Sequence, residues 1–183
     1  MGAASRAAIG FDFTIEIFKP PKWLPKKLHN SAFLCFYHLA DKETIHNIVP
    51  TQGLNHILSV VGNAGTQITT WYLGLFEANY TPVLADTAAT FPASSTESTA
   101  YAEAVRQTWV EAVPSGGAIT NSASKAEFTM NATKTLFGAF LTSSSVKGGI
   151  TGTLLSAAKF SASKTVDSGD IARITASLTL TSS

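Results

Sequence analysis

The feature that most constrains the fold is a series of short strand-like segments, separated by turn signals, in the second half of the chain. The segments are rich in apolar and β-branched residues, whereas the breaks between them contain the Gly, Pro, Asn, Asp and Ser residues that turns prefer. We place strands at residues 101–113, 126–130, 134–142, 152–160 and 171–181. Short strands at this near-regular spacing predict a mainly β fold, an antiparallel β-sandwich of jelly-roll-like character.

Residues 53–77 predict one short helix followed by the first central strand of the sandwich. A helix face with i, i+3, i+4, i+7 spacing is formed by Leu54, Ile57, Leu58 and Val61. Gly62 and Asn63 follow, and both residue types tolerate the left-handed conformation that ends helices. Residues 68–76 are β-branched and aromatic, which is typical of a strand. We expect the helix, near residues 53–61, to cover one end of the sandwich.

The N-terminal part of the chain has a different character. Residues 9–17 alternate with the two-residue period of a strand, with the polar residues Asp12, Thr14 and Glu16 on one face. The opposite, apolar face needs a surface to cover it. Residues 19–27, KPPKWLPKK, contain three prolines that prevent a regular helix and favour an extended path. We predict an extended arm with strand segments at residues 1–44, followed by a β-sandwich domain at residues 45–183.

Two interpretations of the basic segment remain open. In the first, Trp23 anchors an arm on a partner, and the surrounding lysines contact acidic protein or nucleic acid. In the second, the segment is a solvated linker. The first interpretation predicts a partner-binding set that combines the apolar strand face with the basic segment: Phe11, Phe13, Ile15, Ile17, Lys19, Lys22, Trp23, Lys26 and Lys27.

Residues 32–39 and 44–49 are predicted to be two strands joined by a turn at residues 41–43. Such a turn could bring His38 and His46 together near Glu43. Their spacing matches no established metal-ligand pattern, so hydrogen-bonded or exposed imidazoles are the favoured interpretation. We therefore predict no metal site.

Composition indicates a surface that contacts protein. Charged residues make up 14% of the chain, below the roughly 25% of typical soluble domains. A net charge of +1 gives no reason to expect nucleic-acid binding. The single cysteine, Cys35, lies in an apolar run and predicts neither a disulfide nor a cysteine-ligated zinc. We expect no signal peptide, no membrane span and a reducing cytoplasm as the place of assembly.

No catalytic constellation is visible in the sequence. There is no G-x-S-x-G elbow, and the glycine-containing residues 62–66 lack the lysine of a phosphate loop. We therefore predict neither an enzyme nor a cofactor. Residues 78–99 form a long loop, a length that favours a functional or interface role. Aromatic residues could line a sugar-binding groove, although core is the favoured interpretation: Trp71, Tyr72, Tyr80, Phe91, Tyr101 and Trp109.

Residues 69–101 read TTWYLGLFEANYTPVLADTAATFPASSTESTAY, with a helix-like GLNHILSVV before them and GTLLSAAKFSASKTVDSGDIARITASLTL near the end of the chain. The pattern, including Asp86-Thr87 and the run from Glu97 to Tyr101, resembles a family of small structural proteins of tailed bacteriophages, often encoded near the capsid gene. The resemblance covers residues 45–183. It implies a non-enzymatic virion protein.

The leading form of this hypothesis is a capsid cement, or decoration, protein. Such a protein binds and bridges major capsid subunits, and this binding stabilises the assembled head. The arm would add a strand to a neighbour's sheet. The protein would self-associate on the lattice, for example as a trimer, at the capsid surface after assembly in the host cytoplasm. Two alternatives remain open: a tail-associated receptor- or glycan-binding module that uses residues 78–99, and a head–tail adaptor component.

Overall fold

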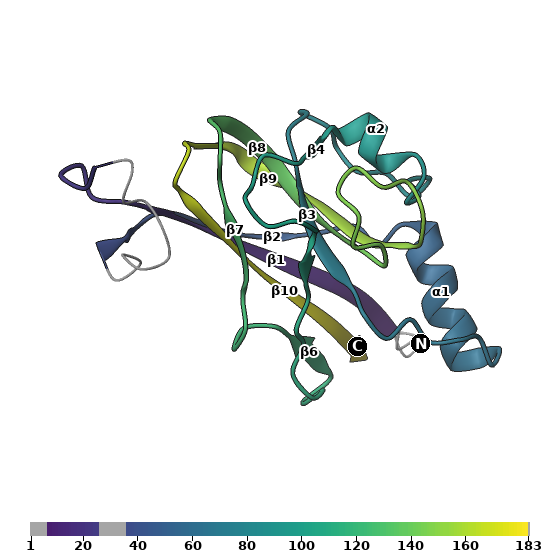
Figure 1. The fold of residues 1–183 in the computed structure, drawn as a ribbon. Coiled ribbons are helices and arrows are strands. Elements are labelled where there is room, and N and C mark those ends of the chain that lie inside the picture. Colours follow the sequence, from purple (N-terminus) through teal and green to yellow (C-terminus); the bar gives the residue numbers. More distant parts are fainter. Residues whose placement is uncertain (1–6, 26–35, 183) are drawn as a thin grey trace.

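The computed structural model describes residues 7–25 and 36–182. These residues form two antiparallel sheets packed face to face, together with two helices (Figure 1). The predicted antiparallel β-sandwich is confirmed. The helix α1 (Thr51–Gly62) confirms the predicted helix at residues 53–61, and a second helix, α2 (Phe91–Ser95), was not predicted.

The first sheet joins the two ends of the chain. Its order is β2 (His38–His46), β1 (Ala7–Lys19), β10 (Ile171–Ser182) and β6 (Ala118–Thr120), and β7 (Ala126–Thr129) also pairs with β10. The register of β1 on β10 runs from Ala7 opposite Ser182 to Phe18 opposite Ile171. The segment predicted as an arm therefore contributes a strand to the sheet, and the predicted boundary at residue 44 falls within β2.

The second sheet contains the strands of the predicted β-domain. Its order is β4 (Glu97–Ser98), β3 (Tyr72–Phe76), β8 (Lys134–Thr142) and β9 (Leu154–Val166), and β5 (Gln107–Thr108) also pairs with β3. The strand predicted at residues 134–142 has these bounds in the structure. Strands β3 and β5 are shorter than predicted. Strand β9 continues past its predicted end because Val166 pairs with Lys134.

The core lies between the two sheets. Phe11 and Phe13 of β1 are 0% exposed, and they pack with Leu73 of β3, Leu141 of β8 and Ile174 of β10. The two-residue alternation places these side chains on one face of each strand. Burial of one such side chain contributes about 1.5–3 kcal/mol. The apolar face of the N-terminal strand is therefore covered by the protein's own core.

A smaller apolar cluster covers the other face of the second sheet. Phe91 of α2 packs against Phe76 and Phe140, with ring centroids 5.5 and 5.3 Å away. The side chain of Asp86 organises the preceding turn by accepting hydrogen bonds from the Tyr80 hydroxyl and the Val83 amide. The prediction that residues 78–99 lack structure of their own was wrong, because buried Phe91 holds a helical turn against the sheet.

Strand β2 also differs from the prediction. Residues 41–43 lie inside this continuous strand instead of forming a turn, because β1 pairs with it there: Ile15 lies opposite Glu43, and Ile17 lies opposite Asp41. His38 and His46 are consequently at opposite ends of β2, which are about 26 Å apart at 3.3 Å per residue. The two imidazoles cannot share a metal ion.

Candidate interaction surfaces

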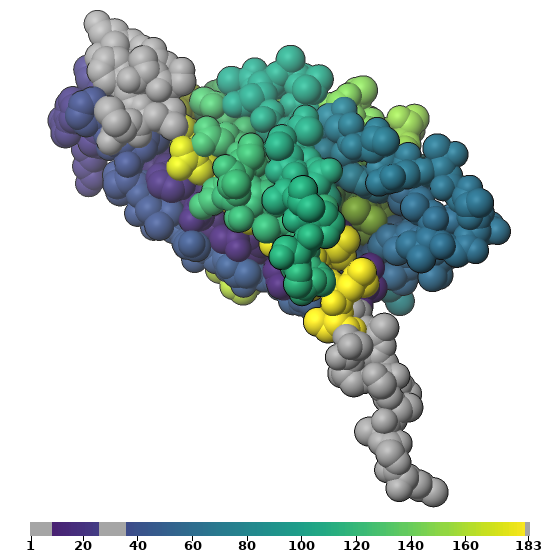
Figure 2. All heavy atoms as spheres, turned by 90° about the horizontal axis from the view of Figure 1, so that it is seen from below, coloured from purple at the N-terminus to yellow at the C-terminus, as the bar shows by residue number. Residues whose placement is uncertain are grey.

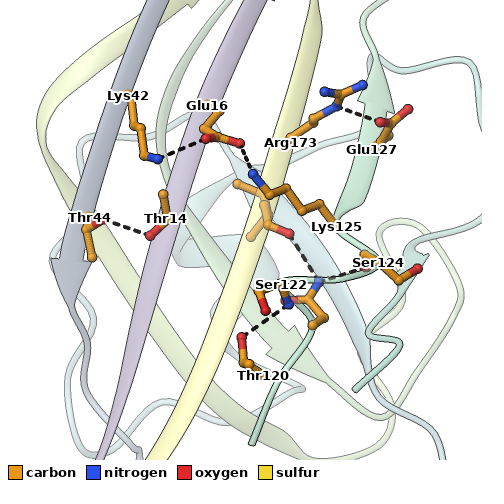
Figure 3. A network of polar contacts seen from close by, with 12 residues as sticks. Thr14, Glu16, Lys42, Thr44, Thr120, Ser122, Ser124, Lys125, Glu127 and Arg173 are labelled. Carbon is orange, nitrogen blue, oxygen red and sulfur yellow. Dashed lines mark hydrogen bonds and ion pairs between the residues drawn. The ribbon is translucent and has the colours of Figure 1, made fainter. Parts of the chain in front are cut away.

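The outer face of the first sheet carries a network of paired polar side chains (Figure 3). Glu16 is 6% exposed, and its carboxylate accepts a hydrogen bond from Lys125 Nζ at 2.6 Å and lies 3.1 Å from Lys42 Nζ. On either side of it, the Thr14 and Thr44 hydroxyls are 2.7 Å apart, and the Arg173 guanidinium lies 2.5 Å from the Glu127 carboxylate. Each of these polar groups therefore has a hydrogen-bond or ion-pair partner within the network.

The pKa values of Glu16 and Glu43 follow from their hydrogen bonds and ion pairs. Burial by itself would raise the pKa of Glu16, but the hydrogen bonds and charges of Lys125 and Lys42 outweigh burial and lower it. The pKa of Glu43 is lowered in the same way, against burial, by Lys164 and Ser161. Both carboxylates are thus held ionised by fixed partners. This chemistry stabilises a fold and supplies no general acid or base near neutral pH.

The residues predicted to bind a partner separate into four groups. Phe11, Phe13, Ile15 and Ile17 lie in the core. Lys19 forms ion pairs within the chain, with Asp170 at 3.1 Å and Asp167 at 3.4 Å. Lys26 and Lys27 are outside the described residues. Lys22 and Trp23 are exposed, and Trp23 is 67% exposed.

Trp23 and Lys22 belong to a projecting surface that we call the hairpin tip, composed of Lys22, Trp23, Phe36 and Leu39. The last pair between β1 and β10 is Phe18 with Ile171, so the chain beyond it extends past the body of the sandwich (Figure 1). The rings of Trp23 and Phe36 meet edge to face at 5.4 Å, and Phe36 is 47% exposed. The tip therefore presents two aromatic rings to solvent.

The base of the hairpin tip is fixed to the turn between β9 and β10. Burial would lower the pKa of Lys19, but its hydrogen bonds and ion pairs with Asp170 and Asp167 outweigh burial and raise it. The Tyr37 hydroxyl donates a hydrogen bond to the Gly169 carbonyl oxygen at 2.9 Å. Gly169 has a φ of 96° in this turn, a conformation that glycine adopts readily. These contacts hold the direction of the tip.

A second surface, the α1 groove, lies beside the helix α1. It is a cavity of about 220 Å³ lined mainly by apolar side chains: Ile57, Val61, Ile68, Trp71, Trp109 and Leu178. Helix α1 approaches β9 so closely that a Cβ on Gly53 would lie 2.4 Å from the Leu155 carbonyl oxygen. Leu54 and Ile57 pack on the core, whereas Leu58 and Val61 are 67% and 82% exposed. Half of the predicted apolar stripe is thus uncovered.

The sequence did not predict the α1 groove. Its lining comes from α1, from residues 67–71, from the segment around Trp109 and from β10. These segments meet only after the sheets have paired. The sequence of α1 gave no local signal for the groove, because its apolar stripe has the ordinary width of a core-facing helix.

The candidate sugar-binding aromatics do not form an exposed platform. Trp71, Phe91, Tyr101 and Trp109 are between 0 and 8% exposed. The Trp109 indole donates a hydrogen bond to the Ala176 carbonyl oxygen at 3.1 Å. The interpretation as core residues is confirmed for these four, whereas Tyr72 and Tyr80 are half-buried.

Residues 7–25 and 36–182 contain no group of three His, Cys, Asp or Glu side chains arranged to hold a metal ion. None of the helices in those ranges is long and apolar enough to cross a membrane. Cys35 and His29 lie outside the described residues.

The fold defines a class of protein, an antiparallel β-sandwich with a projecting hairpin. The family comparison adds the biological class, because residues 44–181 match a family of phage virion structural proteins. The chain belongs to the family described as podophage GP4 fiber I protein gp80. A search of curated proteins found no match. The family match begins within β2, so β1 and Trp23 precede it.

Proposed function

We propose that this protein is a non-enzymatic fibre component of a podophage virion, which attaches to a neighbouring subunit through the hairpin tip. The family match over residues 44–181 carries the fibre assignment, because it spans α1 and the strands from β3 to β10. The description of that family names a fibre protein, which favours a fibre over the capsid cement role.

The exposure of Trp23 supports the tip as the attachment point. Tryptophan is enriched among the residues that dominate interface energies, because one side chain buries a large area with few rotatable bonds. At 67% exposure, the Trp23 ring has most of its surface available to a partner. The ion pair between Lys19 and Asp170 already holds the base of the tip in place. Docking of the tip therefore costs little further conformational entropy.

The apolar half of the predicted arm has a different role in this proposal. Because Phe11 and Ile15 are buried and β1 already lies between β2 and β10, β1 holds the hairpin in the sandwich while the tip makes the contact. Attachment therefore uses side chains of the tip and does not add β1 to a neighbour's sheet.

The substitution Trp23→Ala tests this attachment. Phage particles would be produced with the variant protein supplied in place of the wild type, and its amount per particle measured on a quantitative gel. We expect the variant to fold normally and to be depleted from particles by about tenfold or more, since loss of an interface tryptophan commonly costs over 2 kcal/mol. The matched control is Val146→Ala, an exposed apolar residue on the loop between β8 and β9. Unchanged incorporation of Trp23→Ala would contradict the tip as attachment point.

Copy number and location test the fibre assignment against the cement alternative. A fibre component is present at a low number fixed by the symmetry of its attachment site. A cement protein is present in proportion to the major capsid protein. Quantification against the major capsid protein, combined with antibody labelling in electron micrographs, separates the two. Labelling spread over the whole capsid surface would overturn the fibre proposal.

A further inference from the structure

We propose that the partner of the hairpin tip is a second copy of this chain, which receives Trp23 in its α1 groove. This inference rests on the proposed role of the tip in attachment. The hairpin tip of one copy and the α1 groove of the next copy form one contact.

The first support is the apolar character of both surfaces. The floor of the α1 groove contains Trp71, Trp109 and Ile119, and its rim includes Val61. Val61 is 82% exposed, and its neighbour Leu58 is 67% exposed. Uncovered apolar side chains around a concave surface mark a binding site for another apolar group.

The second support is size. The groove has a volume of about 220 Å³. An apolar protein cavity of roughly 150 Å³ is large enough to bind benzene. The groove therefore has room for one large aromatic side chain such as the indole of Trp23, and it is too small for a whole helix or strand.

The third support is charge. Glu111 lines the groove, and among the described residues no cation lies within ion-pairing distance of it. At the tip, Lys22 is adjacent to Trp23, and within residues 7–25 and 36–182 no carboxylate pairs with it. Insertion of Trp23 would place Lys22 at the rim, where it can pair with Glu111. Complementary charges at a rim favour the correct partner and orientation.

The fourth support is the placement of the two surfaces. The hairpin tip and α1 lie at opposite ends of the molecule, as both the ribbon and the space-filling view show (Figures 1 and 2). Strand β1 has 13 residues and alone spans about 40 Å. A chain cannot reach its own groove. Contact between copies is therefore head to tail, which produces rows of subunits or closed rings.

The experiment uses the full chain with the photo-crosslinking amino acid p-benzoylphenylalanine in place of Trp23. Illumination of the concentrated protein should produce covalent dimers and longer products. Mass spectrometry should locate the crosslinks in α1, residues 67–71 or residues 109–119 of the second copy. Val61→Lys in the same chain should reduce crosslinking by about tenfold or more, because it adds a second cation opposite Lys22. Val146→Lys, away from the groove, should leave crosslinking unchanged.

A mixing experiment tests the head-to-tail geometry. The Trp23→Ala variant keeps an intact groove, and the Val61→Lys variant keeps an intact tip. Each alone should be monomeric by light scattering at the highest concentration at which wild type associates. The mixture should form dimers and nothing larger, because only one contact can be made.

Three results would overturn the second-copy proposal: absence of crosslinked dimers, crosslinks outside the groove, or particle incorporation of Val61→Lys at the wild-type level. The same probe at position 23 in assembled particles separates this outcome from failure of the proposed function. Crosslinks to a different virion protein would leave the tip as an attachment site and remove the second copy as its partner. Normal incorporation of Trp23→Ala would remove the attachment role itself.

Discussion

Arg106 and Glu97 form a buried, bidentate ion pair. Arg106 Nε donates to Glu97 Oε1 at 2.8 Å and Nη2 donates to Oε2 at 2.6 Å, with the two side chains 1% and 2% exposed. The guanidinium also donates to the carbonyl oxygens of Ser144 and Gly149, and the Gly148 amide donates to the Glu97 carboxylate. The pair therefore fixes the loop between β8 and β9 to the strand β4.

Removal of one partner of this pair should be strongly destabilising. We expect Glu97→Ala to lower the free energy of unfolding by about 3–5 kcal/mol, because the guanidinium is left buried without its counter-charge. The measurement is chemical denaturation followed by circular dichroism. The control is Glu127→Ala, which removes the exposed partner of Arg173 and should cost about 1 kcal/mol or less. Equal effects of the two substitutions would contradict the burial of Arg106 and Glu97.

The lowered pKa of Glu16 predicts a loss of stability in acid. A carboxyl whose pKa is lower in the folded state than its ordinary value of 4.5 stabilises the fold above that value, and the contribution disappears as the pH falls through the folded pKa. Glu43 behaves in the same way. We expect the difference in unfolding free energy between wild type and Glu16→Gln to be constant near neutral pH and to shrink below pH 4.5. Denaturant titrations across this range measure it, and a difference that grows in acid would contradict the prediction.

The close packing at Gly138 predicts that even one methyl group is not tolerated there. A Cβ at this position would lie 2.1 Å from Cζ of Phe76 and 2.2 Å from the Ala158 carbonyl oxygen. Gly138→Ala should lower the unfolding free energy by about 1–3 kcal/mol, because backbone and ring must move apart. The matched control is Gly62→Ala, where nothing lies within 4 Å of the new Cβ. Thermal melts should show a lower melting temperature for the first variant and no decrease for the second.

Because α1 is buried unevenly, substitutions along its apolar stripe should lower the unfolding free energy by different amounts. Ile57 packs on the core, so Ile57→Ala should lower the unfolding free energy by about 2 kcal/mol or more. Leu58 is 67% exposed, so Leu58→Gln should change it by only about 0.5 kcal/mol. Urea denaturation of the two variants compares them directly. A large effect of Leu58→Gln on the monomer would show that this side of α1 is covered within the chain.

Local pattern was a good guide for β8 and α1. Strand β8 has its predicted bounds, and α1 contains its predicted residues. Strand β8 is a nearly continuous apolar run because both of its faces are covered, whereas α1 has the helical period, and both signals are visible without knowledge of the partner. Residues 41–43 show the opposite case. Asp41, Lys42 and Glu43 resemble a turn, yet pairing with β1 and the ion pairs of Lys164 keep them in a strand.

The candidate interaction surfaces were predictable only in part. The prolines and lysines around Trp23 marked an exposed segment, and the structure places Trp23 at a projecting tip. The alternation of residues 9–17 showed that one face needed a cover, but not that β10, at the other end of the chain, provides it. Neither the α1 groove nor the Arg106–Glu97 pair has a local signature, because each joins residues from segments far apart.

The sequence by itself determined the class of fold and the positions of most strands, since these depend on periodicity and turn chemistry within short windows. Membership of a phage virion family also follows from the sequence, through the match over residues 44–181. Tertiary structure decided which strands are neighbours, which face of β1 is covered and which half of the α1 stripe is open. The physical reason is that strand pairing and burial depend on the partner surface. That surface exists only once distant segments have come together.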